Sequence, residues 1–145
     1  MIVVDTSVFI DLFFEYDRKR TQLADALFKI IEEKGLPIFE PKVFKIEFIG
    51  QLVRRTKKDR ASIIAEDVFN DVNFVEDNEI YELAFLIAFE TGCRAIDSFY
   101  IATAKVRDAI LVSNDKIQVE SAKKFGVNAF YLIEELEEIK KKLGE

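Results

Sequence analysis

Five short apolar segments recur along the chain, and helical stretches separate each of them from the next. The segments span residues 2–4, 37–40, 72–75, 109–112 and 127–131. Short apolar strands that alternate with helices form parallel sheets whose two faces are covered by those helices. The alternation therefore predicts an α/β fold, a three-layer α/β/α sandwich with a five-stranded parallel sheet. The 145 residues contain no linker and no repeat, so we expect a single domain over residues 1–145.

The helical stretches carry start and stop signals. Gly35 follows the second stretch, as a glycine that ends a helix does, and Pro41 suits the first turn of the third. In a parallel sheet, ligands bind beyond the carboxyl ends of the strands, so site residues are expected there. The expected helices span residues 7–14, 17 or 18 to 34, 42–57, 59–70, 77 or 78 to 92, 97–107, 115–124 and 133–143.

The composition excludes several kinds of site. The chain has no His and a single cysteine, Cys93, which excludes a Ser-His-Asp triad, an internal disulfide and a cysteine-based zinc site. No glycine-rich phosphate loop occurs. Carboxylates dominate instead, with 27 Asp and Glu against 21 Lys and Arg and a net charge of −6. An acidic chain binds nucleic acid only through local basic patches or bound cations.

The apolar runs are short. The longest, residues 83–89, has seven residues, whereas a helix that spans a membrane needs about 20. Asp5 interrupts the apolar start of the chain, which also lacks the basic flank of a secretory signal. We therefore expect a cytoplasmic protein that makes no use of a membrane.

Four acidic residues fall at the carboxyl edge of the expected sheet. Asp5 directly follows the first strand, and Asp115 closely follows the fourth. Glu47 lies inside the helix that leaves the second strand, and Asp97 begins the helix that leads into the fourth. Both helices begin at that edge, because a helix that connects parallel strands runs antiparallel to them. The topology thus brings four carboxylates from distant parts of the chain to one rim.

Each acid also has a purely structural interpretation. Asp5, Asp97 and Asp115 can cap the helices that follow them, because a carboxylate accepts hydrogen bonds from free amides there. Glu47 shares a narrow polar helix face with Gly50, Gln51 and Arg54. Converging carboxylates, however, repel one another unless a hard cation neutralises them, and Mg²⁺ or Mn²⁺ prefers oxygen ligands. Such a site can activate water for hydrolysis of a phosphodiester.

The stretches around these acids resemble the PIN-domain family of metal-dependent ribonucleases, in particular the compact prokaryotic VapC-type toxins of toxin–antitoxin pairs. Residues 2–10 (IVVDTSVFI) resemble the first family motif, a hydrophobic strand followed by Asp-Thr/Ser-Ser. Glu47 stands where the family places a helical glutamate. Residues 95–104 (AIDSFYIATA) and 111–115 (LVSND) resemble its later aspartate motifs. The order and spacing of the motifs fit over nearly the whole chain.

This resemblance implies an endoribonuclease that uses Mg²⁺ or Mn²⁺, a homodimer and, for a toxin, a VapB-like antitoxin as partner. Ser113 stands where Thr is common, and Lys116 and Gln118 follow the last motif where some relatives carry another acid. The second departure weakens the expectation that Asp115 ligates the metal. The implied catalytic and metal-binding residues are Asp5, Glu47, Asp97 and Asp115, and the implied supporting residues are Thr6, Ser7, Ser113 and Asn114.

Arg54 and Arg94 are candidate RNA contacts. Arg54 begins the densest basic segment, residues 54–60, and Arg94 lies three residues before Asp97. Arginines beside an acidic cleft can bind phosphates of a substrate. The alternative is a solvated helix end, where cations are favourable near the C-terminus.

A separate apolar group on the first helix is expected to contact a second copy or an antitoxin, and it comprises Phe9, Leu12, Phe13 and Phe14.

Other functions are less compatible with these residues. A haloacid-dehalogenase-like phosphatase needs a second Asp where Ser7 stands. A response-regulator receiver needs a paired acid near the first strand and a Lys after a late strand, and neither is in place. Two alternatives stay open: an RNA-processing nuclease without an antitoxin, and a non-catalytic domain that binds RNA or protein.

Overall fold

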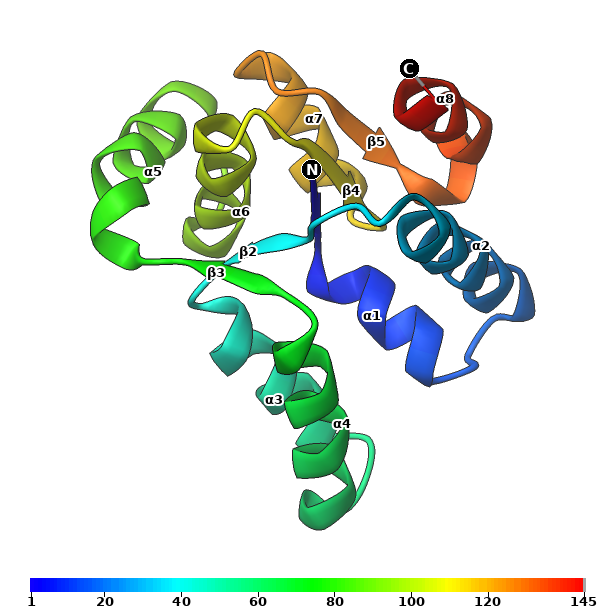
Figure 1. Cartoon of the computed structure of the whole chain (residues 1–145). Coiled ribbons are helices and arrows are strands. Elements are labelled where there is room, and N and C mark those ends of the chain that lie inside the picture. The colour runs from blue at the N-terminus through cyan, green and yellow to red at the C-terminus, as the bar shows by residue number, and fades with distance from the viewer. Residues whose placement is uncertain (145) are drawn as a thin grey trace.

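Parallel strands form the centre of the fold in the computed structural model, which describes residues 1–144 (Figure 1). β1 (Ile2–Val4) pairs with β4 (Ile110–Ser113), and β4 pairs with β5 (Ala129–Tyr131). A second pair joins β2 (Phe39–Pro41) to β3 (Asn73–Val75). All the expected strands are present within the described residues, and their parallel pairing is confirmed. The last residue of the expected domain, residue 145, lies outside the described part.

The expectation of one five-stranded sheet is wrong, because the strands form a sheet of three and a sheet of two. The sheets meet at a single bridge between Ile2 and Ile38, where the Ile2 amide donates to the Pro37 carbonyl over 3.1 Å. β1 turns into a helix at Thr6, and β2 begins only at Phe39. The two strands therefore overlap too little to continue the ladder, and β2 completes its hydrogen bonds with β3.

Helices cover both sides of the strands (Figure 1). α6 packs on β1, β2 and β4 and in turn carries α5, whereas α7 packs on β4 and β5. α8 packs on β5 and on α2, at the other side of the strands in Figure 1. The helices are α1 (Thr6–Phe13), α2 (Arg18–Lys34), α3 (Phe44–Val53), α4 (Lys58–Asn70), α5 (Asp77–Thr91), α6 (Ala95–Val106), α7 (Lys116–Lys124) and α8 (Leu132–Gly144).

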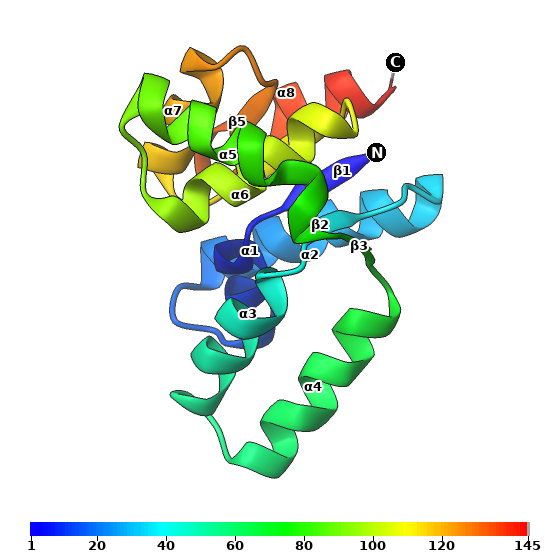
Figure 2. The ribbon, with the colours of Figure 1, turned by 90° about the vertical axis from the view of Figure 1, so that its left-hand side faces the viewer.

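α3 and α4 form a hairpin that extends away from the strands (Figure 2). α3 is shorter than the expected range 42–57, and Pro41 lies in β2 rather than in the first turn of the helix. The reason is that the Lys42 amide still donates to the carbonyl of Val75, over 3.1 Å, so strand pairing continues past Pro41. At the other end, the amides of Arg55 and Thr56 both turn back to the Leu52 carbonyl, which ends the helix.

Other helix ends follow the sequence signals more closely. Asp17 caps α2 by accepting from the Arg20 amide over 3.2 Å, and Gly35 ends it in the left-handed conformation, with φ of 60°. α6 begins earlier than expected, because Arg94 is the extended residue before it, and Asp97 therefore lies in its first turn.

No helix within residues 1–144 combines the length and the apolar character needed to cross a bilayer.

An aromatic cluster fixes α3 against α1. Phe44 and Phe48 are fully buried, and the ring of Phe9 lies 5.2 and 5.6 Å from theirs. The expected apolar surface on α1 is therefore smaller than predicted, since Phe9 is core and Phe13 is the most exposed of its members, at 37%. Because Glu47 lies between Phe44 and Phe48 on α3, the cluster also fixes the position of Glu47 beside α1.

Candidate active site

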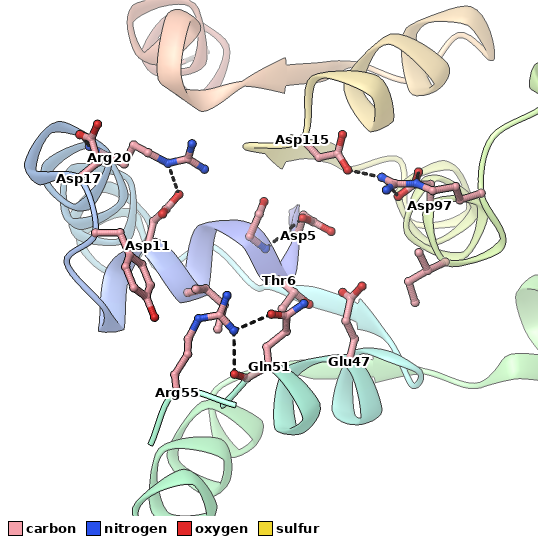
Figure 3. Close-up of a pocket in the computed structure, with 15 residues that line it drawn as sticks. Asp5, Thr6, Asp11, Asp17, Arg20, Glu47, Gln51, Arg55, Asp97 and Asp115 are labelled. Carbon is pink, nitrogen blue, oxygen red and sulfur yellow. Dashed lines mark hydrogen bonds and ion pairs between the residues drawn. The ribbon is translucent and has the colours of Figure 1, made fainter. Parts of the chain in front are cut away.

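Six carboxylates line one cleft of about 560 Å³ beyond the carboxyl ends of β1 and β4, and four of them are the acids predicted from the sequence (Figure 3). Asp5 follows β1, and Asp115 follows β4 and caps α7. Glu47 and Asp97 reach the cleft from the first turns of α3 and α6. The structure thus brings together the acids that the topology placed at this edge.

Asp5 serves as a helix cap and also lines the cleft. Its Oδ2 accepts from the amide of Ser7 over 3.0 Å, and its Oδ1 accepts from Nε2 of Gln118 over 3.1 Å. The residue is only 7% exposed, and burial raises the pKa of its carboxyl although these hydrogen bonds lower it. Both interpretations of Asp5 are compatible with the geometry, because one oxygen caps α1 while the other faces α7.

Arg94 bridges two of the acids. Its Nε donates to Oδ2 of Asp97 over 2.9 Å, and its Nη2 donates to Oδ1 over 3.4 Å. The same Nη2 pairs with Oδ2 of Asp115. Burial raises the pKa of Asp97, and the guanidinium of Arg94 lowers it. The other oxygen of Asp115 accepts from the amides of Ile117 and Gln118 over 3.1 and 3.3 Å, so Asp115 also caps its helix.

Gln118 was not identified as a site residue from the sequence. Its Nε2 donates to both Asp5 and Asp97, over 3.1 and 3.2 Å, and its side chain is almost completely buried. Its Oε1 is buried and has no hydrogen-bond partner among residues 1–144. The available signal was its place three residues after Asp115, since a side chain in the first turn of α7 can face the same edge.

Tyr100 holds Glu47 in place. Its hydroxyl donates to Oε1 of Glu47 over 2.7 Å and lies 2.7 Å from Oγ1 of Thr6. Burial raises the pKa of the tyrosine well above its ordinary value, so the phenol remains a hydrogen-bond donor at neutral pH. Burial also raises the pKa of Glu47. The sequence placed Tyr100 within a family motif but assigned it no contact with the site.

We expect Tyr100→Phe to lower the free energy of unfolding by about 1–2 kcal/mol, because Thr6 and Glu47 both lose a buried partner. Urea unfolding at pH 7 measures the change. The matched control is Tyr81→Phe, which removes a hydroxyl from an exposed ring on α5 and should change stability by less than about 0.5 kcal/mol. Equal stability of the Tyr100→Phe and wild-type proteins would contradict a structural role for this hydroxyl.

The implied supporting residues hold the chain at the end of β4. Oγ of Ser7 accepts from the Asn114 amide over 3.0 Å, and Oγ of Ser113 accepts from the Asp115 amide over 2.9 Å. The side-chain amide of Asn114 donates to Asp11 over 2.6 Å. Asp11, which the sequence did not single out, also pairs with Arg20 over 3.1 Å. This network links α1 and α2 to the loop that presents Asp115.

The two predicted RNA contacts differ in position. Arg94 lines the cleft, but Arg54 lies outside it, and its neighbour Arg55 lines the cleft instead. The guanidinium of Arg55 donates to the carbonyl and side-chain oxygens of Gln51 over 2.8 and 2.7 Å (Figure 3). It also lies 5.7 Å from the ring of Tyr16, which is 69% exposed. Both arginines lie in the turn that follows the end of α3 at Val53.

Glu40 is a further acid that sequence reasoning missed. It is fully buried in β2, and neither carboxylate oxygen has a hydrogen-bond partner within the described residues. Burial raises the pKa of Glu40 well above its ordinary value, and the charge of Asp5 raises it further. The sequence signal was an acid at the end of an apolar strand, a position that is buried if the strand is central. Burial therefore favours the protonated form of the Glu40 carboxyl.

The donor set matches the chemistry of a hard divalent cation. It consists of carboxylate oxygens, and burial raises the pKa of Asp5, Glu47 and Asp97, so the ionised form of each is less favourable here than in water. In the arrangement of residues 1–144, however, no three acidic, His or Cys side chains are grouped closely enough to share one ion. The donors of Arg94 and Gln118 lie against these carboxylates instead.

Comparison with known proteins points to one family. The sequence model of the PIN domain matches residues 2–124. Among curated protein sequences, none matches this chain significantly.

Solved structures share the fold over most of their length. The crystal structure of PAE2754 from Pyrobaculum aerophilum is 20% identical, with a TM-score of 0.64, over 99% of this chain and 96% of that chain. FitAcB from Neisseria gonorrhoeae is 17% identical, with a TM-score of 0.64, over 92% and 99%. A toxin–antitoxin complex from Klebsiella pneumoniae is 18% identical, with a TM-score of 0.58, over 79% and 87%.

Proposed function

Because this chain belongs to the PIN domain family, whose members are generally nucleases, we propose that it is a divalent-metal-dependent endoribonuclease that hydrolyses RNA phosphodiester bonds. The observation that carries the proposal is the cleft itself. Four of its six carboxylates reach it from the ends of β1 and β4 and from α3 and α6, and these segments are far apart in the sequence. Within residues 1–144 the cleft contains neither His nor Cys, so its chemistry depends on oxygen ligands.

Asp5, Glu47, Asp97 and Asp115 are the residues that would hold Mg²⁺ or Mn²⁺. The bound ion would lower the pKa of a water molecule and offset the charge of the phosphate. The chain's own polar groups orient these acids. The Ser7 amide and Gln118 fix Asp5, Tyr100 fixes Glu47, and the amides at the start of α7 fix Asp115.

Single-stranded RNA is the proposed substrate because an exposed aromatic ring and arginines flank the acids. Tyr16 lines the cleft beside Arg55, and an exposed ring can stack on an unpaired base. Arg55 and Arg94 are the proposed phosphate contacts within the cleft, and Arg54 lies just outside it. These side chains provide local positive charge on a chain whose net charge is −6.

The test is incubation of the purified protein with single-stranded RNA in Mg²⁺ or Mn²⁺, with and without EDTA. We expect cleavage that EDTA abolishes. Asp97→Asn, purified in the same way, is the control for contaminating ribonuclease and should leave the RNA intact. Equal cleavage by this variant, or cleavage in EDTA, would point to a contaminant, and failure to cleave several RNAs with both metals would favour a non-catalytic binding role.

For the biological role, we infer the toxin of a toxin–antitoxin pair, acting on RNA in the cytoplasm as a homodimer with a VapB-like antitoxin as partner. One solved structure with this fold is a toxin–antitoxin complex. An apolar groove of about 490 Å³ is available for such a partner, and its lining includes Leu12, Phe13, Phe28, Leu36, Val68 and Val72. An RNA-processing nuclease without an antitoxin is the alternative, and a neighbouring gene for a small DNA-binding protein would distinguish the two.

A further inference from the structure

Three arginines line the acidic cleft, and they have different partners. Arg20 pairs with Asp11 over 3.1 Å, and Arg55 donates to Gln51 over 2.7 and 2.8 Å. Arg94 pairs with Asp97 and Asp115. Within residues 1–144, the arginine contacts of Asp5, Glu47, Asp97 and Asp115 therefore come from Arg94.

The position of Arg94 allows its guanidinium to move away from Asp97 and Asp115. It is the extended residue just before α6, and 60% of its side chain is exposed, whereas Asp97 is almost fully buried. The guanidinium thus reaches a buried carboxylate from the open side of the cleft. Its planar fork places two donors on Asp97 and shares one of them with Asp115. An ion pair anchored on the solvent side costs less to separate than one that is buried on both sides.

We propose that Arg94 is an internal counter-ion that occupies the Asp97–Asp115 side of the cleft in the metal-free protein and gives up these contacts when a divalent cation binds. The proposal rests on the proposed function, because it assigns the cation to these acids. A guanidinium and a divalent cation that need the same carboxylate oxygens compete for them. Arg94 therefore sets the cation concentration at which the site fills, and it stabilises clustered acids that would otherwise repel one another.

Calorimetric titration with Mn²⁺ tests this competition in the wild type, Arg94→Gln and Arg55→Gln. We expect Arg94→Gln to bind Mn²⁺ about tenfold more tightly, since charge-assisted hydrogen bonds no longer have to be broken. Arg55→Gln removes the same charge from the same cleft, but its bonds go to Gln51, so its affinity should change by less than about threefold. In EDTA, Arg94→Gln should melt at a lower temperature than Arg55→Gln, and Mn²⁺ should raise its melting temperature more.

The outcomes separate the two proposals. Unchanged or weaker Mn²⁺ binding by Arg94→Gln, while the wild type binds Mn²⁺ and cleaves RNA, would overturn the counter-ion role and leave the nuclease function standing. An equal gain by Arg55→Gln would also overturn it, because general electrostatics would then explain the effect. If neither the wild type nor Arg94→Gln binds Mn²⁺, the metal-dependent function fails, and the counter-ion role fails with it.

Discussion

Asp5→Asn is expected to abolish RNA cleavage while the protein stays folded and becomes more stable without metal. Burial raises the pKa of Asp5, so its ionised form is less favourable in the folded protein than in the unfolded chain. Removing the charge should raise the free energy of unfolding in EDTA by about 1 kcal/mol, which corresponds to about 2–4 °C in melting temperature. The cap on α1 survives, because Asn accepts the Ser7 amide about as well as Asp.

Thermal unfolding in EDTA and in excess Mg²⁺, together with an RNA cleavage assay, measures both effects. The order of stability should reverse in Mg²⁺, because only the wild type gains from the ion. Asp17→Asn is a matched control, since Asp17 caps α2 with the same kind of bond and, although it also lines the cleft, is not one of the four proposed metal-binding acids. If Asp5→Asn cleaves RNA as fast as the wild type, Asp5 is a helix cap alone and the nuclease proposal loses the acid at the end of β1.

Glu40→Leu is expected to stabilise the protein by about 2 kcal/mol at pH 7, because it removes two buried oxygens that have no hydrogen-bond partner in the described part of the chain. The wild type should also lose stability as pH rises above 4.5, the ordinary pKa of this carboxyl, because the folded protein keeps a proton that the unfolded chain releases. One retained proton gives a slope of about 1.4 kcal/mol per pH unit. Glu40→Leu should remove that part of the slope.

Urea unfolding between pH 4.5 and 8.5 gives the stability of the wild type, Glu40→Leu and Glu40→Gln. The glutamine variant keeps the shape and polarity of the side chain but cannot ionise, so it should reduce the slope as much as leucine does. Asp5, Glu47 and Asp97 also have raised pKa values, and their contribution remains in every variant. Wild-type and variant curves that run parallel would show that Glu40 does not change its protonation on folding.

The parts of the site that depend on strand order could be predicted from the sequence. Asp5 and Asp115 follow strands, and Asp97 lies in the first turn of a connecting helix, so parallel topology alone places them at one edge. Tyr100, Gln118 and Glu40 could not be predicted in the same way. Tyr100 bonds to Glu47 across 53 residues of sequence, and Gln118 bonds to Asp5 across 113. Local spacing can place Gln118 at this edge, but it does not identify the partners of either side chain.

The division into two sheets could not be predicted either. It depends on whether β1 and β2 share one hydrogen-bonded bridge or several. Because each strand has only three residues, individual contacts around Ile2 decide the number of bridges. The position of Pro41 could not be predicted for a similar reason. Proline is favourable in the first turn of a helix, but the hydrogen bond from the Lys42 amide to the Val75 carbonyl extends the strand pairing past Pro41. In both cases one tertiary hydrogen bond outweighs a local preference.

Because Glu47 lies on the α3–α4 hairpin, the acids of the cleft are held in place in two different ways. Asp5 and Asp115 stand at the ends of paired strands, whereas Glu47 depends on a helix that extends from the sheet and is fixed through the rings of Phe9, Phe44 and Phe48. Regions with fewer connections to the core open at lower free energy than the core itself. On heating, Glu47 should therefore leave its position beside α1 before the strands separate, and the proposed RNA cleavage should stop at a temperature where the protein still has its fold.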